Sequence, residues 1–121
     1  MQRDMDIVRD LLRLAAETTE PRVDAYAIAD DSTSRELIAY HVRTMTQAGL
    51  IESYVKPDGQ PAPASCFITS LTWAGNDFFD SVRSDTVWSE IKRKLASGIG
   101  SVSFDVLASL ASSVSSRLLG L

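Results

Sequence analysis

Cysteine and histidine are nearly absent from this sequence of 121 residues, which holds one of each, Cys66 and His41. A single cysteine excludes an internal disulfide and a Cys-rich zinc site. A lone histidine without a second ligand at fixed spacing is a poor metal ligand and a poor catalytic base. The sequence also lacks a Gly-rich phosphate loop and a nucleophile elbow. We therefore expect a protein without metal or cofactor that is not an enzyme.

Long apolar runs are also missing. No run approaches the roughly 20 residues needed to span a bilayer, and the N-terminus MQRDMDIVRD has no apolar signal core. Hydrophobic residues make up 45% and charged residues 23% of the chain, which is typical of a globular protein and not of a disordered one. We expect a cytoplasmic protein that does not enter a membrane.

Basic residues are in deficit. Twelve Lys and Arg stand against 16 Asp and Glu, for a net charge of -4. A protein that binds DNA tightly usually carries a basic surplus, because neutralised phosphates supply most of the affinity. Any DNA contact here would need a local basic patch on an acidic body.

The first periodic segment, residues 4–17, predicts an amphipathic helix. Its apolar residues recur at helical spacing and its charged residues take the opposite side. Residues 18–21 then break the helix. Residues 23–28 alternate apolar and polar side chains over too short a stretch to decide between a strand and a stub of helix.

A second helix is predicted over residues 34–48. Thr33 and Glu36 fit a capping box at its start, and Gly49 fits the left-handed position after its end. Its apolar positions include Ile38, Val42 and Met45. The sequence Ala-Gly-Leu-Ile that follows is typical of the passage from a recognition helix into the β-hairpin of a winged helix.

The hairpin is predicted from two segments rich in β-branched and aromatic residues, 51–56 and 65–70. Between them, residues 57–63 hold three prolines and a Pro-Asp-Gly turn, which indicates a stiff wing tip that cannot join the sheet. These elements predict an α+β, mostly helical protein: a winged helix-turn-helix with a two-stranded β-hairpin wing and a C-terminal helical extension.

Helices follow the hairpin. Thr72 is placed to cap the first and Asp85 the second, whose basic last turn suits the negative end of the helix dipole. A short linker at 97–100 leads to a final helix starting at Ser101 or Ser103. We expect a winged-helix domain over residues 1–96 and a C-terminal helix over residues 101–119.

That last helix has a narrow apolar seam with spacings of three and four, flanked mostly by serines. So little charge surrounds the seam that it must pack on something, either its own domain or the same helix of a second copy, and the dimer is slightly favoured. The candidate dimer residues are Phe104, Leu107, Ala111, Val114 and Leu118.

Several sequence blocks are shared with a known family. They are RDMD at residues 3–6, IAYHVRTMTQAGLIE at 38–52 and SLTWAGNDFFDSVRSDTVWSEIKRKL at 70–95, extended by SFDVL at 103–107. With these blocks the chain resembles the domain-of-unknown-function family 2513, a bacterial and phage family placed among winged-helix proteins. The resemblance implies a fold and little chemistry. The family typically has histidine where this chain has Asn76, so a role for that histidine does not carry over.

In a winged helix, the polar face of the helix at 34–48 would be the surface that reads DNA. Arg43 and Gln47 could contact base edges, Tyr40 and Thr44 could reach phosphate or sugar, and Arg35 near the helix start could hold a phosphate. Glu36 on the same face would repel phosphate, and the wing offers only Lys56. An ordinary solvated helix face explains the same pattern equally well.

Three function classes follow, with different partners. The first is a DNA-binding transcriptional regulator that binds double-stranded DNA as a homodimer. The second is a protein-interaction module of phage or mobile-element origin that binds a host protein and not DNA. An enzyme comes third, because His41 and Cys66 are read as structural residues.

Trp73 and Trp88 are expected to be core or interface anchors.

Overall fold

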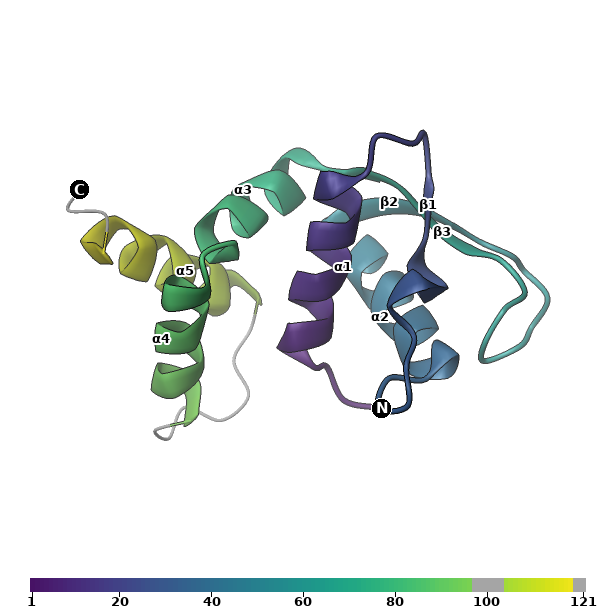
Figure 1. The fold of residues 1–121 in the computed structure, drawn as a ribbon, viewed down its shortest axis with the longest axis horizontal. Helices are drawn as coiled ribbons and strands as arrows, with labels where there is room; N and C mark the ends of the chain where they lie inside the picture. The colour runs from purple at the N-terminus through teal and green to yellow at the C-terminus, as the bar shows by residue number, and fades with distance from the viewer. Residues whose placement is uncertain (97–103, 119–121) are drawn as a thin grey trace. The chain divides into compact units, whose positions relative to one another are not determined.

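The computed structural model describes residues 1–96 and 104–118 and shows an α+β protein that is mostly helical (Figure 1). The chain clusters into two compact units, Met1–Asn76 and Asp77–Leu121. The predicted linker at 97–100 and the predicted helix starts at Ser101 and Ser103 lie outside the described residues. Within the described ranges no helix is both long and apolar enough to cross a bilayer.

The elements of the first unit alternate between helix and strand. In order they are α1 (Met5–Glu17), β1 (Val23–Asp24), the 3-10 helix η1 (Ala25–Ile28), α2 (Arg35–Gln47), β2 (Ile51–Val55), β3 (Cys66–Leu71) and the start of α3 (Trp73–Val82). Helix α1 begins after Asp4, whose side chain accepts the Asp6 N–H at 2.9 Å. Its apolar residues Ile7, Val8, Leu11 and Leu12 are buried, which confirms the amphipathic helix predicted over 4–17.

Residues 23–28, for which the sequence did not decide between strand and helix, contain a short strand followed by a 3-10 helix. Val23 and Asp24 form β1, and the Asp24 side chain then caps η1 by accepting the Tyr26 N–H at 2.9 Å. Tyr26 is buried, and its hydroxyl donates to the Pro63 carbonyl at 2.7 Å. A tertiary contact therefore fixes a segment whose local pattern is ambiguous.

Helix α2 is present as predicted, but its cap is one residue later than expected. Ser34, in an extended conformation, accepts the Leu37 N–H at 3.1 Å. Thr33 is instead held by the side chain of Asp30, which accepts its N–H at 2.8 Å. At the other end, Gly49 has a φ of 78°, which confirms the left-handed position after the helix.

The end of α2 is a Schellman motif. The Leu50 N–H donates to the Met45 carbonyl at 3.0 Å and the Gly49 N–H to the Thr46 carbonyl at 3.1 Å. These bonds satisfy carbonyl groups of the last turn that have no partner inside the helix. They also turn the chain directly into β2.

The predicted hairpin is confirmed, and β1 adds a third strand to it. The strand order is β1-β3-β2, with both pairs antiparallel. Cys66 and Ile68 of β3 are buried in the core. Phe67 points to the opposite face of the sheet, because side chains alternate along a strand, and Tyr54 is its partner on β2.

The loop that closes the hairpin is held by its own side chains. One oxygen of the Asp58 carboxylate accepts the Gln60 N–H and the other the Ala64 N–H, both at 3.0 Å. These two backbone N–H groups lower the pKa of Asp58. Gly59 has a φ of 74°, as its place in a tight turn requires.

The base of the hairpin is closed around Thr72. Its hydroxyl donates to the Gly49 carbonyl at 2.5 Å and accepts the Gly75 N–H at 3.0 Å, which confirms Thr72 as the cap of α3. A Cβ atom on Gly75 would clash with the Leu50 carbonyl oxygen. Glycine is therefore the residue that lets α3 begin against the end of α2.

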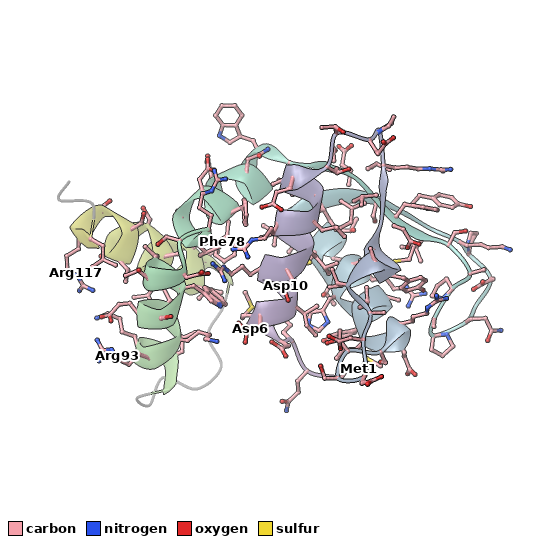
Figure 2. All side chains as sticks on the ribbon, viewed as in Figure 1. Met1, Asp6, Asp10, Phe78, Arg93 and Arg117 are labelled. Carbon is pink, nitrogen blue, oxygen red and sulfur yellow. The ribbon has the colours of Figure 1, made fainter. Side chains whose placement is uncertain are left out.

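The second unit contains the remainder of α3 and the helices α4 (Asp85–Ala96) and α5 (Phe104–Leu118). Ser84, not the predicted Asp85, caps α4, because the Val87 N–H donates to Ser84 Oγ at 3.4 Å and the Trp88 N–H to the Ser84 carbonyl at 2.9 Å. Helix α5 packs against α4. Glu90 of α4 accepts hydrogen bonds from Arg93 and from Arg117 of α5, two side chains labelled in Figure 2.

Candidate nucleic-acid interface

The outward face of α2 carries the polar stripe that the sequence predicted. Glu36, Arg43 and Gln47 are exposed, and Tyr40 and Thr44 are partly exposed. The opposite face, with Ile38, Val42 and Met45, is fully buried or nearly so. The Thr44 hydroxyl donates to the His41 carbonyl at 3.1 Å, so it is partly committed to the helix. The stripe holds one cation and one anion and is electrically close to balanced.

Arg35 lies apart from this stripe, at the first turn of α2. Its guanidinium carbon is 5.0 Å from the centroid of the Tyr26 ring, which is a cation–π contact. Helical spacing places Ala39 between Arg35 and Arg43 on the flank of α2, and Ala39 is fully buried. The two arginines therefore border the core along the side of α2 that contacts η1.

Arg43 reaches the hairpin loop. Its Nη2 donates to the Gln60 carbonyl at 3.3 Å, and the Tyr26 hydroxyl donates to the nearby Pro63 carbonyl at 2.7 Å. Burial raises the pKa of Tyr26, while the positive charges of Arg35 and Arg43 oppose that shift. Both guanidinium groups thus act on one phenol ring. Helix α2, η1 and the hairpin loop meet at this ring.

Some of the cations have no carboxylate partner. In the described part of the chain, four cations form no ion pair: Arg22, Arg35, Arg43 and Lys56. Arg83 pairs with Asp80, and both Arg93 and Arg117 pair with Glu90. The guanidinium carbon of Arg22 lies 4.4 Å from the centroid of the Phe67 ring, which is a cation–π contact. All four unpaired cations belong to β1, α2, the hairpin or residues next to them. Helix α1, by contrast, presents Asp6 and Asp10 (Figure 2).

His41 and Cys66 are structural residues. His41 is fully buried. Its Nε2 accepts the Asp4 N–H and its Nδ1 donates to the Leu37 carbonyl, both at 2.8 Å, so the neutral ring carries its proton on Nδ1. Burial raises the pKa of the Cys66 thiol to about 11. Among the described residues no three possible ligands are close enough to hold a metal ion.

Sequence reasoning missed Tyr26 and Arg22. Tyr26 organises the candidate interface, yet its only signal in the sequence is that it is the sole aromatic residue between positions 23 and 28. Arg22 stands alone before a two-residue strand and gives no periodic signal. Lys56 was included from the sequence, and it is exposed at the end of β2.

The apolar seam of α5 is occupied within the chain. Leu107, Ala111 and Val114 are buried, and α5 packs on α4. Leu118 is 46% exposed, and the side chain of Phe104 lies outside the described residues. A dimer through this seam stays a prediction, and it would have to use side chains that one chain already covers.

The two tryptophans differ sharply. Trp88 of α4 is buried, whereas Trp73 at the start of α3 is 85% exposed. Large exposed aromatic side chains are enriched among the residues that anchor protein–protein interfaces. Trp73 is therefore a second candidate site.

A hollow of about 430 Å³ lies in the second unit. It is open to solvent, and the structure leaves no buried side-chain N or O atom of the described residues without a hydrogen-bond partner to receive a ligand. Its lining residues are Asp80, Ser81, Arg83, Ser84, Thr86, Val87, Ser115 and Leu118.

Comparison with known proteins adds the family. The model of the family described as "Hypothetical protein (DUF2513)" matches residues 2–101. The chain is also similar to an uncharacterized protein of Haemophilus influenzae, with 28% identity over 119 residues that cover 98% of this chain and 99% of that protein. No solved structure matches. The chain belongs to the DUF2513 family.

Proposed function

We propose that the first unit is a winged-helix domain that binds double-stranded DNA, and that the protein is a transcriptional regulator of bacterial or phage origin. In this proposal α2 is the recognition helix and the β2–β3 hairpin is the wing. The observation that carries it is that four cations that form no ion pair in the described residues, Arg22, Arg35, Arg43 and Lys56, lie on or beside α2, β1 and the hairpin.

The order of the elements supports this reading. A winged helix has a helix, a strand, two further helical segments and a hairpin, and here these are α1, β1, η1 with α2, and β2 with β3. The first strand pairs with the last, as in the order β1-β3-β2. Such a domain places the helix before the hairpin in the major groove.

The charges support a modest affinity. Arg43 and Gln47 on the stripe have the chemistry to contact base edges, and Arg35 and Lys56 to contact phosphates. Glu36 on the same stripe repels phosphate, and the net charge of -4 opposes approach to DNA. Affinity must therefore come from the few cations that are not neutralised within the protein.

Fluorescence anisotropy with a random-sequence DNA duplex tests the proposal. We expect binding that weakens as salt rises, because counterions are released from DNA, and an affinity that falls when Arg43 is changed to Ala. Arg93→Ala is the matched control, since it removes the same charge from α4. Absent binding, or binding that salt does not affect, would contradict the proposal.

A second candidate is a protein-interaction module of phage or mobile-element origin. The exposure of Trp73 favours it, because an indole that is 85% exposed carries a large apolar area with no partner in the described residues. The partner in this case is a host protein with an apolar pocket for the ring.

Co-purification from host lysate, with the wild-type protein and Trp73→Ala side by side, tests the second candidate. A partner that is recovered by the wild type, lost with Trp73→Ala and then bound by the purified protein would support it. DNA binding without any partner that depends on Trp73 would reject it.

A further inference from the structure

One arginine stacks on the ring of Tyr26, and a second contacts the loop that the Tyr26 hydroxyl holds. The Arg35 guanidinium lies on the Tyr26 ring at 5.0 Å, and Arg43 donates to the Gln60 carbonyl in the loop that Tyr26 holds through Pro63. Both arginines are exposed. Within the described residues neither makes an ion pair.

Such an arrangement has an electrostatic cost. The positive charges of Arg35 on the ring and of Arg43 on the neighbouring loop repel each other, and neither forms an ion pair within the described residues. The Asp24 carboxylate, which accepts the Tyr26 N–H and caps η1, supplies one negative charge nearby, so two positive charges face one negative charge. The local charge is therefore suited to an anion from outside.

The donors also fit an anion of a particular shape. A guanidinium has several N–H donors in a planar fork that matches the oxygens of a phosphate. Arg43 uses one N–H for the Gln60 carbonyl, and Arg35 uses its flat face for Tyr26. Most of the donors of both groups stay open to a ligand.

The support beneath the two arginines is fixed. Tyr26 is buried, its N–H is bound by Asp24 and its hydroxyl by Pro63. The loop carbonyl that Arg43 contacts belongs to a turn closed by Asp58. A pre-formed site loses less conformational entropy when its ligand binds.

We propose that Arg35 and Arg43 clamp one phosphate group of the nucleic-acid backbone, with Tyr26 as their support. The clamp rests on the proposed DNA binding and makes it more specific: α2 and the hairpin loop act as one rigid surface whose position on the duplex is set by a shared phosphate. Its contribution is positional and does not depend on the base sequence, so Arg43 contacts phosphate in this arrangement and Gln47 is left to contact base edges.

The salt dependence of DNA binding tests the clamp. For duplex DNA, each neutralised phosphate adds about 0.9 to the slope of log K against log salt. We expect the double variant Arg35→Ala/Arg43→Ala to lose about 0.9, whereas two separate phosphates would give a loss of about 1.8. Each single variant should keep most of the slope, because the remaining arginine still neutralises the phosphate.

Arg22→Ala is the matched control. Arg22 is also exposed and also stacks on an aromatic ring, but Phe67 lies on the face of the sheet opposite to Cys66 and the core. This variant should leave the slope unchanged. A second measurement follows the arginine Nε–H resonances by NMR while inorganic phosphate is added, and we expect Arg35 and Arg43 to shift together and Arg22 to stay in place.

The outcomes separate the clamp from the proposed function. DNA binding with an unchanged slope in the double variant, or with a loss of about 1.8, overturns the shared clamp and leaves DNA binding standing. No DNA binding, with phosphate shifting both resonances, overturns the proposed function and supports a phosphate clamp for another ligand. No DNA binding and no shift overturns both.

Discussion

Two glycines at the base of the hairpin differ in how much space surrounds them. Gly75→Ala puts a Cβ atom against the Leu50 carbonyl oxygen, whereas a Cβ on Gly49 meets nothing within 4 Å. We expect Gly75→Ala to lower the free energy of unfolding by about 3 kcal/mol through this clash. Gly49→Ala should cost about 1 kcal/mol, because only its left-handed conformation is strained. Urea denaturation measures both, and equal losses would contradict the clash.

The thiol of Cys66 gives a dependence on pH. Its pKa rises from an ordinary value of 9.0 to about 11 in the folded protein, so the unfolded chain releases this proton first as pH rises. The contribution of this thiol to the free energy of unfolding is therefore fully present below pH 9 and is lost as the pH rises toward 11. Cys66→Ala should remove this part of the loss. Native Cys66 should also resist a thiol reagent at pH 8 and react once the chain is unfolded, and rapid modification of the native protein would contradict its burial.

His41 links α2 to the start of α1. Changing it to Leu leaves the Asp4 N–H without its acceptor, so we expect a loss of about 1–3 kcal/mol in the free energy of unfolding. Gln47→Leu on the exposed side of α2 is the control and should change stability by less than about 0.5 kcal/mol. Amide exchange at Asp4 measured by NMR should speed up in His41→Leu, and unchanged exchange would show that the bond is unimportant.

At the scale of elements, local patterns predicted α1, α2, the hairpin and the glycine after α2, because periodicity and turn chemistry act over a few neighbouring residues. The capping residues Thr33 and Asp85 were wrong by one position, since a serine beside each can do the same work. The structure of 23–28 could not be predicted, because the Tyr26–Pro63 contact decides it.

The seam of α5 shows a further limit, because its spacing predicts an apolar contact but not the partner. Burial of Leu107 within the chain leads us to expect that Leu107→Ala lowers the free energy of unfolding by about 2–5 kcal/mol. The molar mass in solution should stay the same, as measured by light scattering. Ser109→Ala, at an exposed position of α5, is the control. A change from dimer to monomer in Leu107→Ala would instead support the dimer through this seam.

At the scale of the whole molecule, the acidic residues outnumber the basic ones in the first unit and not in the second. Residues 1–76 hold seven Lys and Arg against eleven Asp and Glu, and residues 77–121 hold five of each. The pairs Arg83–Asp80 and Arg93–Glu90 lie three residues apart and follow from helical spacing. The cations that form no ion pair could not be predicted from the sequence, because the fold decides which carboxylates come near them. The candidate site was therefore predicted in its α2 residues and missed in Tyr26 and Arg22.

This distribution limits how strongly salt can affect DNA binding. Within the described residues Arg22, Arg35, Arg43 and Lys56 form no ion pair. With one phosphate shared by Arg35 and Arg43, a second bound by Lys56 and none by Arg22, these cations should neutralise about two phosphates, for a slope of about -1.8. Anisotropy titrations at several salt concentrations measure the slope. A much steeper value for a monomer would mean that ion pairs within the protein open on DNA.

The bonds around Thr72 and Gly49 have a consequence for the evolution of the wing. They fasten both ends of the hairpin 23 residues apart in the sequence, and the tip is closed separately by Asp58. Residues added between the strands would lengthen a loop whose ends are already fixed, and each doubling of loop length costs only about 0.6 kcal/mol. Insertions that leave Gln60 and Pro63 in their contacts with Arg43 and Tyr26 should therefore lengthen the wing at little cost while its base stays constant.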